Sequence, residues 1–217
     1  MESQKQGPYH HGQLRQALLD AALQLITQHG IDSLTLREVA RQAGVSHAAP
    51  YHHFADKSTL VEAVAVESFH AFATALREAP TPSGTALEHL IALGRAYVRF
   101  AVEHSASFRL MYRPELRRSP FPEGQEHPAT SSVIDEAALE GYQILANCII
   151  ACQSAGYIPA GDLKPLTLTA WSTVHGLAVL LLDGSLGNLT RGGLSVEEAD
   201  NLAESVIQRL LHGLLVR

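Results

Sequence analysis

The sequence has little of what marks secreted or membrane-spanning proteins. Only two of its 217 residues are cysteine, Cys148 and Cys152, and their i, i+4 spacing favours core packing over a disulfide framework. No apolar run reaches the ~18 residues of a membrane span, and residues 1–12 lack the apolar core of a signal peptide. We therefore expect a cytoplasmic protein that does not associate with a membrane.

The motifs of catalysis, cofactor binding and metal binding are also missing. There is no Ser-His-Asp order, no metal-ligand spacing and no phosphate-binding loop. The neighbouring His52 and His53 would point about 100° apart on a helix, and no third ligand lies close to them in sequence. We expect no catalytic residue, no metal and no cofactor.

Positive charge is scarce overall, but it is unevenly distributed. The formal net charge is −6, which argues against a nucleic-acid partner for the chain as a whole. Residues 1–60 are nevertheless neutral, with five Lys or Arg against five Asp or Glu, and they hold six of the twelve histidines. The acidity lies in residues 61–217, so the N-terminal part is the less unfavourable one for DNA.

What the sequence does contain is helical periodicity along its whole length. Apolar residues recur at three- and four-residue spacings, and no segment alternates as a strand would. We predict an all-α fold of about nine helices and a loop over residues 113–129. The expected helices cover residues 13–28, 35–43, 46–54, 58–79, 85–104, 106–112, 132–155, 163–183 and 196–215.

The chain is long enough for one small and one medium domain. A stretch with two prolines and a glycine, residues 80–84, follows the fourth expected helix, and we place the domain boundary near that helix. The prediction is an N-terminal domain over residues 13–66 and a C-terminal domain over residues 67–217.

A helix-turn-helix motif is predicted over residues 35–54. Thr35 and Glu38 form a capping box that opens its first helix, Gly44 ends that helix, and Ser46 can cap the second, recognition helix. Such a pair of short helices is the geometry of a DNA reader. Its small core should consist of Leu36, Val39, Ala40, Val45 and Phe54.

The recognition helix carries no lysine or arginine. Positive charge near it has to come from Arg37, Arg41 and Lys57, while its own histidines, Ser46 and Tyr51 offer hydrogen bonds to bases or phosphates. We expect the Tyr51 ring to pack with its hydroxyl free, and Phe54 to be a core residue. The candidate DNA-binding residues are Thr35, Arg37, Ser46, His47, Ala48, Ala49, Tyr51, His52, His53 and Lys57.

This N-terminal segment resembles the TetR (tetracycline-repressor-like) family of transcriptional regulators. The resemblance covers about residues 13–66 and rests on a helix ending in Gly30, followed by Thr35, Val39-Ala40, Ala43-Gly44-Val45-Ser46, Tyr51-His-His-Phe54 and Lys57. It implies that Thr35 and Lys57 contact phosphates, that Tyr51 and His53 brace the DNA backbone, and that residues 46–49 with His52 face bases. It also implies a homodimer on a pseudo-palindromic operator.

The last two long helices are predicted to form the dimer interface. Residues 163–183 are apolar on nearly every side and should be buried on two faces, and the helix at 196–215 has a single apolar stripe. Pairing these helices between two chains would give a four-helix interface. The candidate interface residues are Leu166, Val174, Leu177, Leu181, Leu202, Val206 and Leu210.

Aromatic and polar residues of the C-terminal domain indicate a pocket for an unknown small-molecule effector. Trp171 and His175 share a helix face at i, i+4, and with Gly176 they resemble a Trp-His-Gly pattern in one branch of the family's C-terminal domains. For His175, packing with one hydrogen bond is the competing interpretation. The candidate ligand-binding residues are Tyr97, Phe100, Phe108, Met111, Tyr112, Tyr142, Trp171 and His175.

Together these patterns predict a ligand-responsive repressor with three partners: double-stranded operator DNA, a second copy of the chain and a small molecule. One alternative is a DNA-binding protein without an effector, controlled by a partner protein or acting architecturally. A second is an all-helical enzyme, which would leave the exposed segment from Ser46 to His53 without a purpose.

Overall fold

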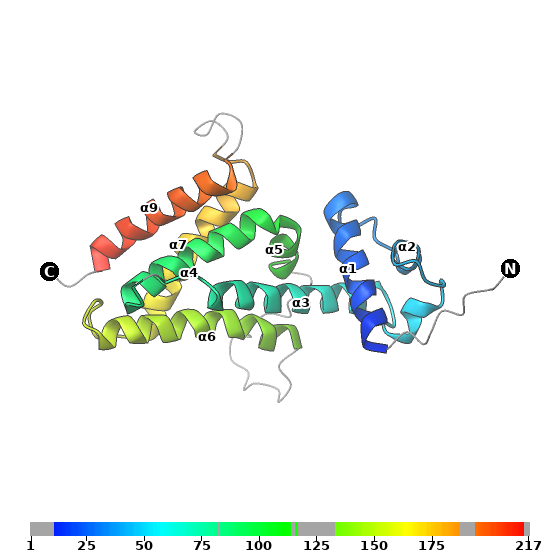
Figure 1. The fold of residues 1–217 in the computed structure, drawn as a ribbon, viewed down its shortest axis with the longest axis horizontal. Coiled ribbons are helices and arrows are strands. Elements are labelled where there is room, and N and C mark those ends of the chain that lie inside the picture. The colour runs from blue at the N-terminus through cyan, green and yellow to red at the C-terminus, as the bar shows by residue number, and fades with distance from the viewer. Residues whose placement is uncertain (1–10, 82, 114–115, 117–132, 187–193, 215–217) are drawn as a thin grey trace, which may run out of the picture. The chain divides into compact units, whose positions relative to one another are not determined.

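The computed structural model describes residues 11–81, 83–113, 116, 133–186 and 194–214. Within these ranges it has eight α-helices, one 3₁₀ helix and no strand, so the all-α prediction of about nine helices is confirmed. The expected loop over residues 113–129 falls almost wholly outside them. The elements are α1 (His11–His29), α2 (Leu36–Gln42), the 3₁₀ helix η1 (Ala49–His52), α3 (Lys57–Arg77), α4 (Ala86–Glu103), α5 (Ser105–Met111), α6 (Val133–Ser154), α7 (Leu163–Leu182) and α9 (Val196–Leu214) (Figure 1).

The chain divides into two compact units between Glu67 and Ser68. The division falls inside α3, which therefore contributes its first half to one unit and its second half to the other. The boundary expected from the sequence, after residue 66, lies one residue away from this division.

The first unit is built from α1, α2, η1 and the start of α3. Gly30 ends α1 with a φ of 77°, a left-handed conformation that glycine adopts without strain, and its N–H donates to Ile26 O at 2.9 Å. The expected core is largely confirmed, because four of its five residues are buried and Val45 alone is half-buried. The buried four are Leu36, Val39, Ala40 and Phe54.

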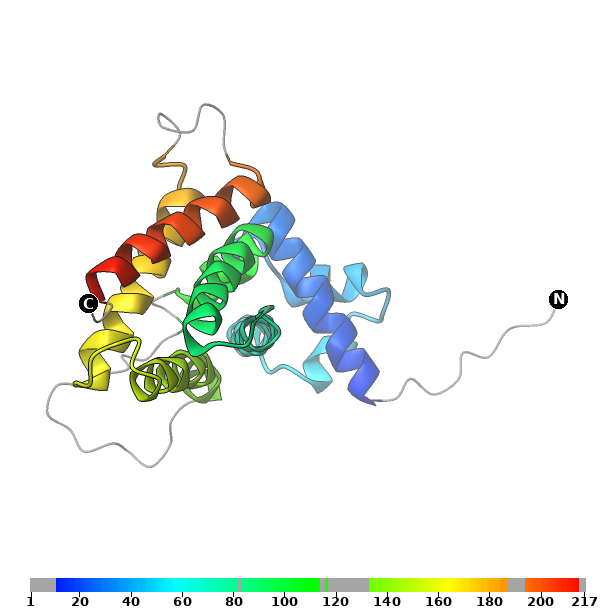
Figure 2. The ribbon, with the colours of Figure 1, turned by 60° about the vertical axis from the view of Figure 1, so that its left-hand side comes forward.

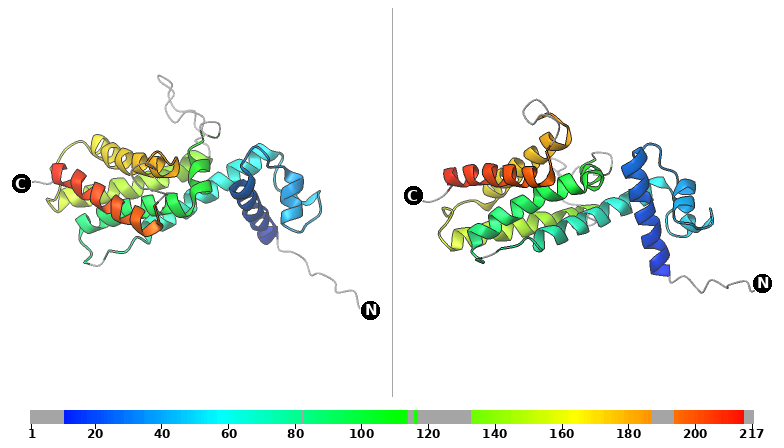
Figure 3. Two further views of the ribbon diagram at one scale, coloured as in Figure 1. Left: turned by 90° about the horizontal axis from the view of Figure 1, so that it is seen from above. Right: turned by 45° about the horizontal axis from the view of Figure 1, so that its top comes forward.

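The second unit is organised around α4, which packs against α5, α6, α7 and α9. Figures 2 and 3 show α9 running alongside α4 and α7, with α6 beside the second half of α3. At the α4–α9 crossing, a Cβ on Gly94 would lie 2.6 Å from Ile207 Cδ1. The absence of a side chain at this position therefore sets how closely the two helices approach.

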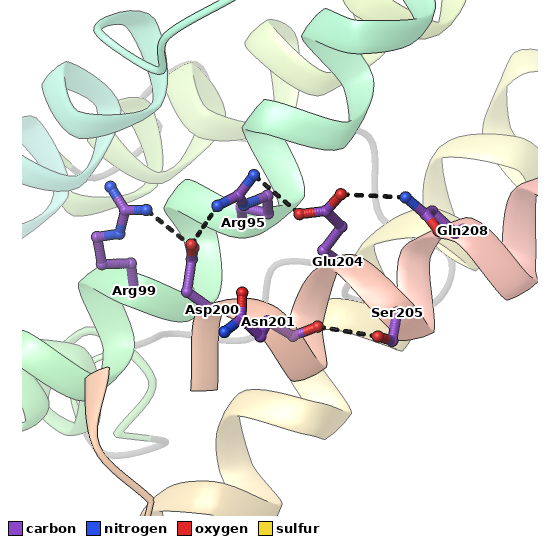
Figure 4. Close-up of polar contacts among 7 residues, drawn as sticks. All are labelled: Arg95, Arg99, Asp200, Asn201, Glu204, Ser205 and Gln208. Carbon is purple, nitrogen blue, oxygen red and sulfur yellow. Dashed lines mark hydrogen bonds and ion pairs between the residues drawn. The ribbon is translucent and has the colours of Figure 1, made fainter. Parts of the chain in front are cut away.

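A cluster of ion pairs joins α4 to α9 (Figure 4). The Asp200 carboxylate accepts from Arg95 and lies 2.9 Å from Arg99 Nη2, while Arg95 Nη1 lies 2.9 Å from Glu204 Oε2. Asp200 is almost completely buried, and its pKa is lowered below the usual value by the Arg95 hydrogen bond first and the Arg99 contacts second. A charged, paired Asp200 is thus part of the folded state at neutral pH.

Helix caps fix the ends of the second unit's helices. Thr85 accepts from Glu88 N at 3.2 Å to open α4, and Asp162 accepts from Lys164 N at 3.1 Å to open α7. The capping box predicted before α9 is present, since Ser195 Oγ accepts from Glu198 N and Glu198 accepts from Ser195 N at 2.7 Å. Each cap satisfies donors that the first helical turn leaves without partners.

Cys148 and Cys152 are both buried free thiols in α6, which confirms their predicted role in the core. Their sulfurs lie 3.8 and 3.2 Å from the carbonyl oxygen of Ala86, at the start of α4. The two thiols therefore take part in the packing of α6 on α4.

In the part of the chain that the structure describes, two helices are long and apolar enough by composition to cross a membrane, α3 and α7. Core helices of proteins outside the membrane meet the same criterion, and half of the apolar window of α3 is buried inside the fold. Helix α7 keeps exposed apolar side chains, Leu168, Val179 and Leu180.

Candidate functional site

The recognition segment is not the α-helix that the sequence predicts. Residues 47–53 form turns and the short 3₁₀ helix η1, with i→i+3 bonds from Ala49 N to Ser46 O at 3.0 Å and from His53 N to Pro50 O at 2.9 Å. Pro50 explains the difference, because it has no N–H to donate to Ser46 O and its ring crowds that carbonyl. The predicted Ser46 cap is also wrong, since no side chain caps η1.

The segment nevertheless presents its polar side chains to solvent. Among the ten candidate DNA-binding residues, Ala49, His53 and Lys57 are half-buried, and the other seven are exposed. The exposed seven are Thr35, Arg37, Ser46, His47, Ala48, Tyr51 and His52. The exposed set therefore offers imidazoles, hydroxyls and a guanidinium that can reach a nucleic acid.

The two aromatic residues of this segment have opposite environments. Phe54 is 2% exposed and lies under the Arg15 guanidinium, 5.7 Å from its ring centroid, so its predicted core role is confirmed. Tyr51 is 61% exposed, so the expectation that its ring packs against the fold is wrong. Most of the Tyr51 side chain is therefore available to a partner.

The Thr35 hydroxyl both accepts and donates a hydrogen bond. Its oxygen accepts from Glu38 N at 3.2 Å, and its hydroxyl donates to Glu38 Oε2 at 2.9 Å. The hydroxyl proton is thus held by a carboxylate in the free protein. A phosphate that takes this proton has to displace Glu38.

Lys57 is anchored at the start of α3. Its Nζ donates to the carbonyl oxygen of Asp32 at 3.0 Å, which joins α3 to the segment that precedes α2. An ammonium has three donors, so two remain for a phosphate while this bond is kept. The anchor fixes the position of the charge and lowers the entropy cost of a phosphate contact.

The second unit contains a cavity of about 90 Å³ enclosed by α3, α4, α6, α7 and α9. Its walls are formed by apolar and aromatic side chains, with Gly94 and Gly141 where helices approach closely. The lining residues are Phe69, Phe72, Leu76, Leu90, Leu93, Gly94, Tyr97, Tyr112, Ala138, Gly141, Tyr142, Leu145, Ile149, Ile158, Leu166, Ala170, Trp171, Val174, Ile207, Leu210 and Leu211.

Four of the eight candidate ligand-binding residues line this cavity: Tyr97, Tyr112, Tyr142 and Trp171. His175 does not line it, but forms a shallow depression on α7 together with Tyr112 and Trp171. Three more candidates are buried and do not line the cavity, Phe100, Phe108 and Met111, and the rings of Phe100 and Phe108 pack against the wall residues Phe72 and Tyr97. The sequence thus located the aromatic end of the cavity and not its full extent.

A network of hydrogen bonds centres on the Tyr97 hydroxyl at this aromatic end. Its oxygen lies 3.0 Å from Tyr112 Oη, 2.8 Å from His175 Nδ1 and 3.2 Å from Trp171 Nε1, which donates. A hydroxyl has one donor and two acceptor positions. All three bonds form when Trp171 and Tyr112 donate to Tyr97, and Tyr97 donates to a neutral His175 that carries its proton on Nε2.

Burial keeps this network uncharged. It raises the pKa of Tyr97 far above the usual tyrosine value, with the neighbouring Tyr112 adding to the shift, and it lowers the pKa of His175 below 6.5. A phenol and a neutral imidazole therefore meet at the cavity wall at neutral pH.

Sequence reasoning missed most of the cavity wall, including Phe69, Phe72 and Leu76 of α3 and the leucines of α4. These residues follow the ordinary apolar periodicity of core helices, so nothing in their pattern marks a cavity. The signal that was present is the pair of small wall residues in α6, Ala138 and Gly141, which lie about one helical turn apart.

The candidate interface residues of α7 divide between the two sides of the helix. Val174 and Leu177, which the sequence assigned to the dimer interface, are buried within the protomer, 7% exposed each. Their burial could not be predicted because an apolar helix does not reveal which face its own protomer covers. The exposed face of α7 instead carries Leu168, Val179 and Leu180. The other candidates are half-buried, namely Leu166 and Leu181 on α7 and Leu202, Val206 and Leu210 on α9, and Leu166 and Leu210 line the cavity.

Two family profiles match the chain. Residues 18–64 match "Bacterial regulatory proteins, tetR family", and residues 90–210 match "Tetracyclin repressor-like, C-terminal domain". The second match alone covers more than half of the chain.

Among curated proteins, the HTH-type transcriptional regulator AcrR of Shigella flexneri is 52% identical over 46 residues, 21% of each chain. The chain spans only about a fifth to a quarter of the length of the first curated relatives it matches. Sequence similarity to these relatives is thus confined to a short segment.

Solved structures match over the whole length. A protein of unknown function from Rhodococcus sp. RHA1 is 33% identical with a TM-score of 0.74, and the match covers 97% of this chain and 100% of that one. The transcriptional regulator FadR of Bacillus subtilis, solved in complex with stearoyl-CoA, is 18% identical with a TM-score of 0.69 over 92% of this chain and 98% of that one. The second match shows similarity of fold alone.

Proposed function

The chain belongs to the TetR family of bacterial transcriptional regulators, and on this premise we propose that it is a ligand-responsive repressor that binds operator DNA as a homodimer. Its first unit reads the DNA, and the cavity of its second unit receives the effector. As a DNA-binding regulator it acts in the cytoplasm.

DNA recognition rests on the exposed face of the first unit. We assign phosphate contacts to Thr35, Arg37 and Lys57, and contacts with the sugar-phosphate backbone to Tyr51 and His53. The small side chains of Ala48 and Ala49 allow close approach to base edges in the major groove. The base-facing group comprises Ser46, His47, Ala48, Ala49 and His52.

The observation that best supports control of DNA binding by a ligand is that α3 is one continuous helix. This one helix begins with Lys57, anchored to the segment before α2, and supplies Phe69, Phe72 and Leu76 to the cavity wall. A ligand that shifts these wall residues therefore acts on the helix that holds Lys57. If the ligand fits the cavity better in one position of α3 than in another, its binding would be coupled to DNA binding.

Dimerisation is assigned to the exposed side of α7 together with α9. Leu168, Val179 and Leu180 are between 37% and 44% exposed, and burying such a stripe against a second copy removes apolar surface from water. In a dimer, the two recognition segments would meet successive major grooves about 34–36 Å apart.

Two other functions have less support. Control by a partner protein in place of a small molecule would leave the aromatic cavity without a role. An enzyme is disfavoured because the matched curated relatives are named as transcriptional regulators, and FadR, with its stearoyl-CoA, illustrates that this fold can hold a small molecule.

The test is footprinting of the full chain on the DNA upstream of its own gene. We expect symmetric protection of two half-sites one helical turn apart. Tyr51→Ala should weaken binding to every sequence, whereas His52→Ala should change the base preference at one position in each half-site. Absence of protection on any DNA would overturn the proposal.

A further inference from the structure

No charged side chain is found among the described residues that line the cavity of the second unit. None of these residues is Asp, Glu, Lys, Arg or His, and their polar side-chain atoms belong to three tyrosines and one tryptophan. An ionised carboxylate or ammonium in such a space would lose its hydration without gaining a partner, which is strongly unfavourable. The wall therefore selects against ionised ligands.

Two arginines next to the cavity are paired away from it. Arg95 follows the wall residue Gly94, yet its guanidinium contacts Asp200 and Glu204 of α9. Arg77 follows Leu76 and is bound to Glu140 of α6. Both arginines already neutralise acidic groups, so neither is placed to receive a ligand anion.

The polar end of the cavity offers one open hydrogen-bonding group. The Tyr97 hydroxyl is saturated by its three neighbours, and the Trp171 N–H is used by Tyr97. Among the described residues, Tyr142 lines the cavity and makes no hydrogen bond through its hydroxyl. That hydroxyl can donate to or accept from a neutral polar group of a ligand.

The size and the walls of the cavity restrict the ligand further. At about 90 Å³ it is smaller than the ~300–1,000 Å³ of typical ligand pockets, so a molecule much larger than one ring requires the walls to move. Six aromatic side chains enclose it, and aromatic pairs favour the edge-to-face packing that Phe72 already makes with Tyr97 at 5.1 Å.

From these observations we propose that the cavity takes a small, uncharged, single-ring molecule with one hydrogen-bonding group, of the phenol type, whose hydroxyl pairs with Tyr142. This inference rests on the proposed function in that it identifies the chemical class of the effector. Binding and control of DNA are nevertheless measured separately, so the two proposals can fail independently.

The experiment uses the single tryptophan of the chain as its reporter, because Trp171 lines the cavity. Full-length protein is titrated with p-cresol, toluene and p-toluate, which share one ring and differ in carrying a hydroxyl, no polar group or a carboxylate. Fluorescence is excited at the red edge of the indole band, where the three probes do not absorb. We expect saturable binding of p-cresol and binding of p-toluate weaker by about a hundredfold or more at neutral pH.

Variants locate the binding site. Tyr142→Phe should weaken p-cresol about threefold to tenfold and leave toluene unchanged, because only the hydroxyl partner is lost. Ala138→Leu should abolish binding by filling the cavity, whereas Ala151→Leu, the same change at an exposed position of α6, should not. Circular dichroism of both leucine variants controls for folding.

Equal or tighter binding of p-toluate would overturn the inference, as would the absence of any response to p-cresol and toluene. A loss of p-cresol binding in Ala151→Leu equal to that in Ala138→Leu would overturn the assignment to this cavity. Binding of p-cresol supports the proposed ligand class whether or not it releases the operator. If p-cresol binds and the operator complex persists, the result counts against control of DNA binding by the ligand, and not against the ligand class.

Discussion

The hydroxyl of Tyr97 lies 2.8 Å from Nδ1 of His175, and it also accepts the N–H of Trp171 at 3.2 Å. One buried oxygen atom thus joins α4 to two positions on α7. Tyr97 is only 6% exposed, so the hydrogen bonds of its hydroxyl to Trp171 and His175 form in a largely desolvated environment.

Tyr97→Phe should lower the free energy of unfolding by about 1–2 kcal/mol, because it removes a buried hydroxyl that bonds the half-buried Trp171 N–H and His175 Nδ1. Urea denaturation provides the measurement. Tyr157→Phe is the matched control, since its half-buried hydroxyl has no bond among the described residues and its removal should be nearly neutral. Equal effects of the two changes would contradict a structural role for the network.

His175 should make stability depend on pH. Its folded pKa is lowered by burial, so the unfolded chain takes up the proton first as pH falls. Stability is therefore highest above the unfolded pKa of about 6.5, decreases as pH falls through that value, and levels off below the folded pKa. The difference in unfolding free energy between wild type and His175→Gln, followed across this range, should show the slope, and a constant difference would disprove it.

Asp200 should be the most important acid of the α4–α9 cluster. Asp200→Asn removes the charge that Arg95 and Arg99 share in a buried position, at an expected cost of about 1.5–3 kcal/mol in unfolding free energy. Because its folded pKa is lowered, this contribution is complete above the unfolded pKa of 3.8 and is lost as pH falls through the folded value. Glu204→Gln, the same change at a more exposed site, should cost less than about 1 kcal/mol.

Leu180→Glu should dissociate the dimer. The side chain is 44% exposed on the apolar face of α7, and a carboxylate buried against a second copy would raise the dimer dissociation constant about a hundredfold or more. Sedimentation equilibrium checks this expectation. Val133→Glu is the control, because Val133 is 64% exposed on α6, outside the proposed interface, and if it dissociated the dimer equally the interface would have to be moved.

Lys57→Met should reduce operator affinity and lower the slope of log affinity against log salt concentration by about 0.9, since one phosphate contact is lost. Fluorescence anisotropy across a salt series supplies the slope. Lys164→Met removes a charge from an exposed position at the start of α7 in the second unit and should leave the slope unchanged. An unaltered slope in Lys57→Met would show that Asp32, and not DNA, is the only partner of this lysine.

The sequence predicted helices well where local chemistry determines their ends. The Thr35 and Ser195 capping boxes and the terminating Gly30 act within a single turn, and all three function as expected. The prediction from sequence was wrong at Pro50. It placed this proline in the first turn of an α-helix, whereas residues 49–52 form a 3₁₀ helix. Capping signals are local, whereas the response to a proline depends on what the next turn packs against.

The residues of the cavity and of α7 show a different limit. Val174 and Leu180 are both apolar residues of one helix, yet the first packs inside the protomer and the second is exposed. Nothing in the sequence of α7 predicts this difference in burial, because it arises from the positions of α4 and α9. The same holds for Asp200, whose partners on α4 lie about a hundred residues away in sequence.

The 3₁₀ geometry of residues 49–52 has a consequence for reading a DNA sequence. Successive side chains are about 120° apart around the axis of a 3₁₀ helix and about 100° apart around that of an α-helix. Over three residues a 3₁₀ helix therefore completes a full turn, whereas an α-helix falls about 60° short of one. Ala49 and His52 consequently project in nearly the same direction. If the first unit binds DNA as proposed, Ala49 and His52 would therefore face the same part of the groove, whereas the same two positions of an α-helix would diverge by about 60°.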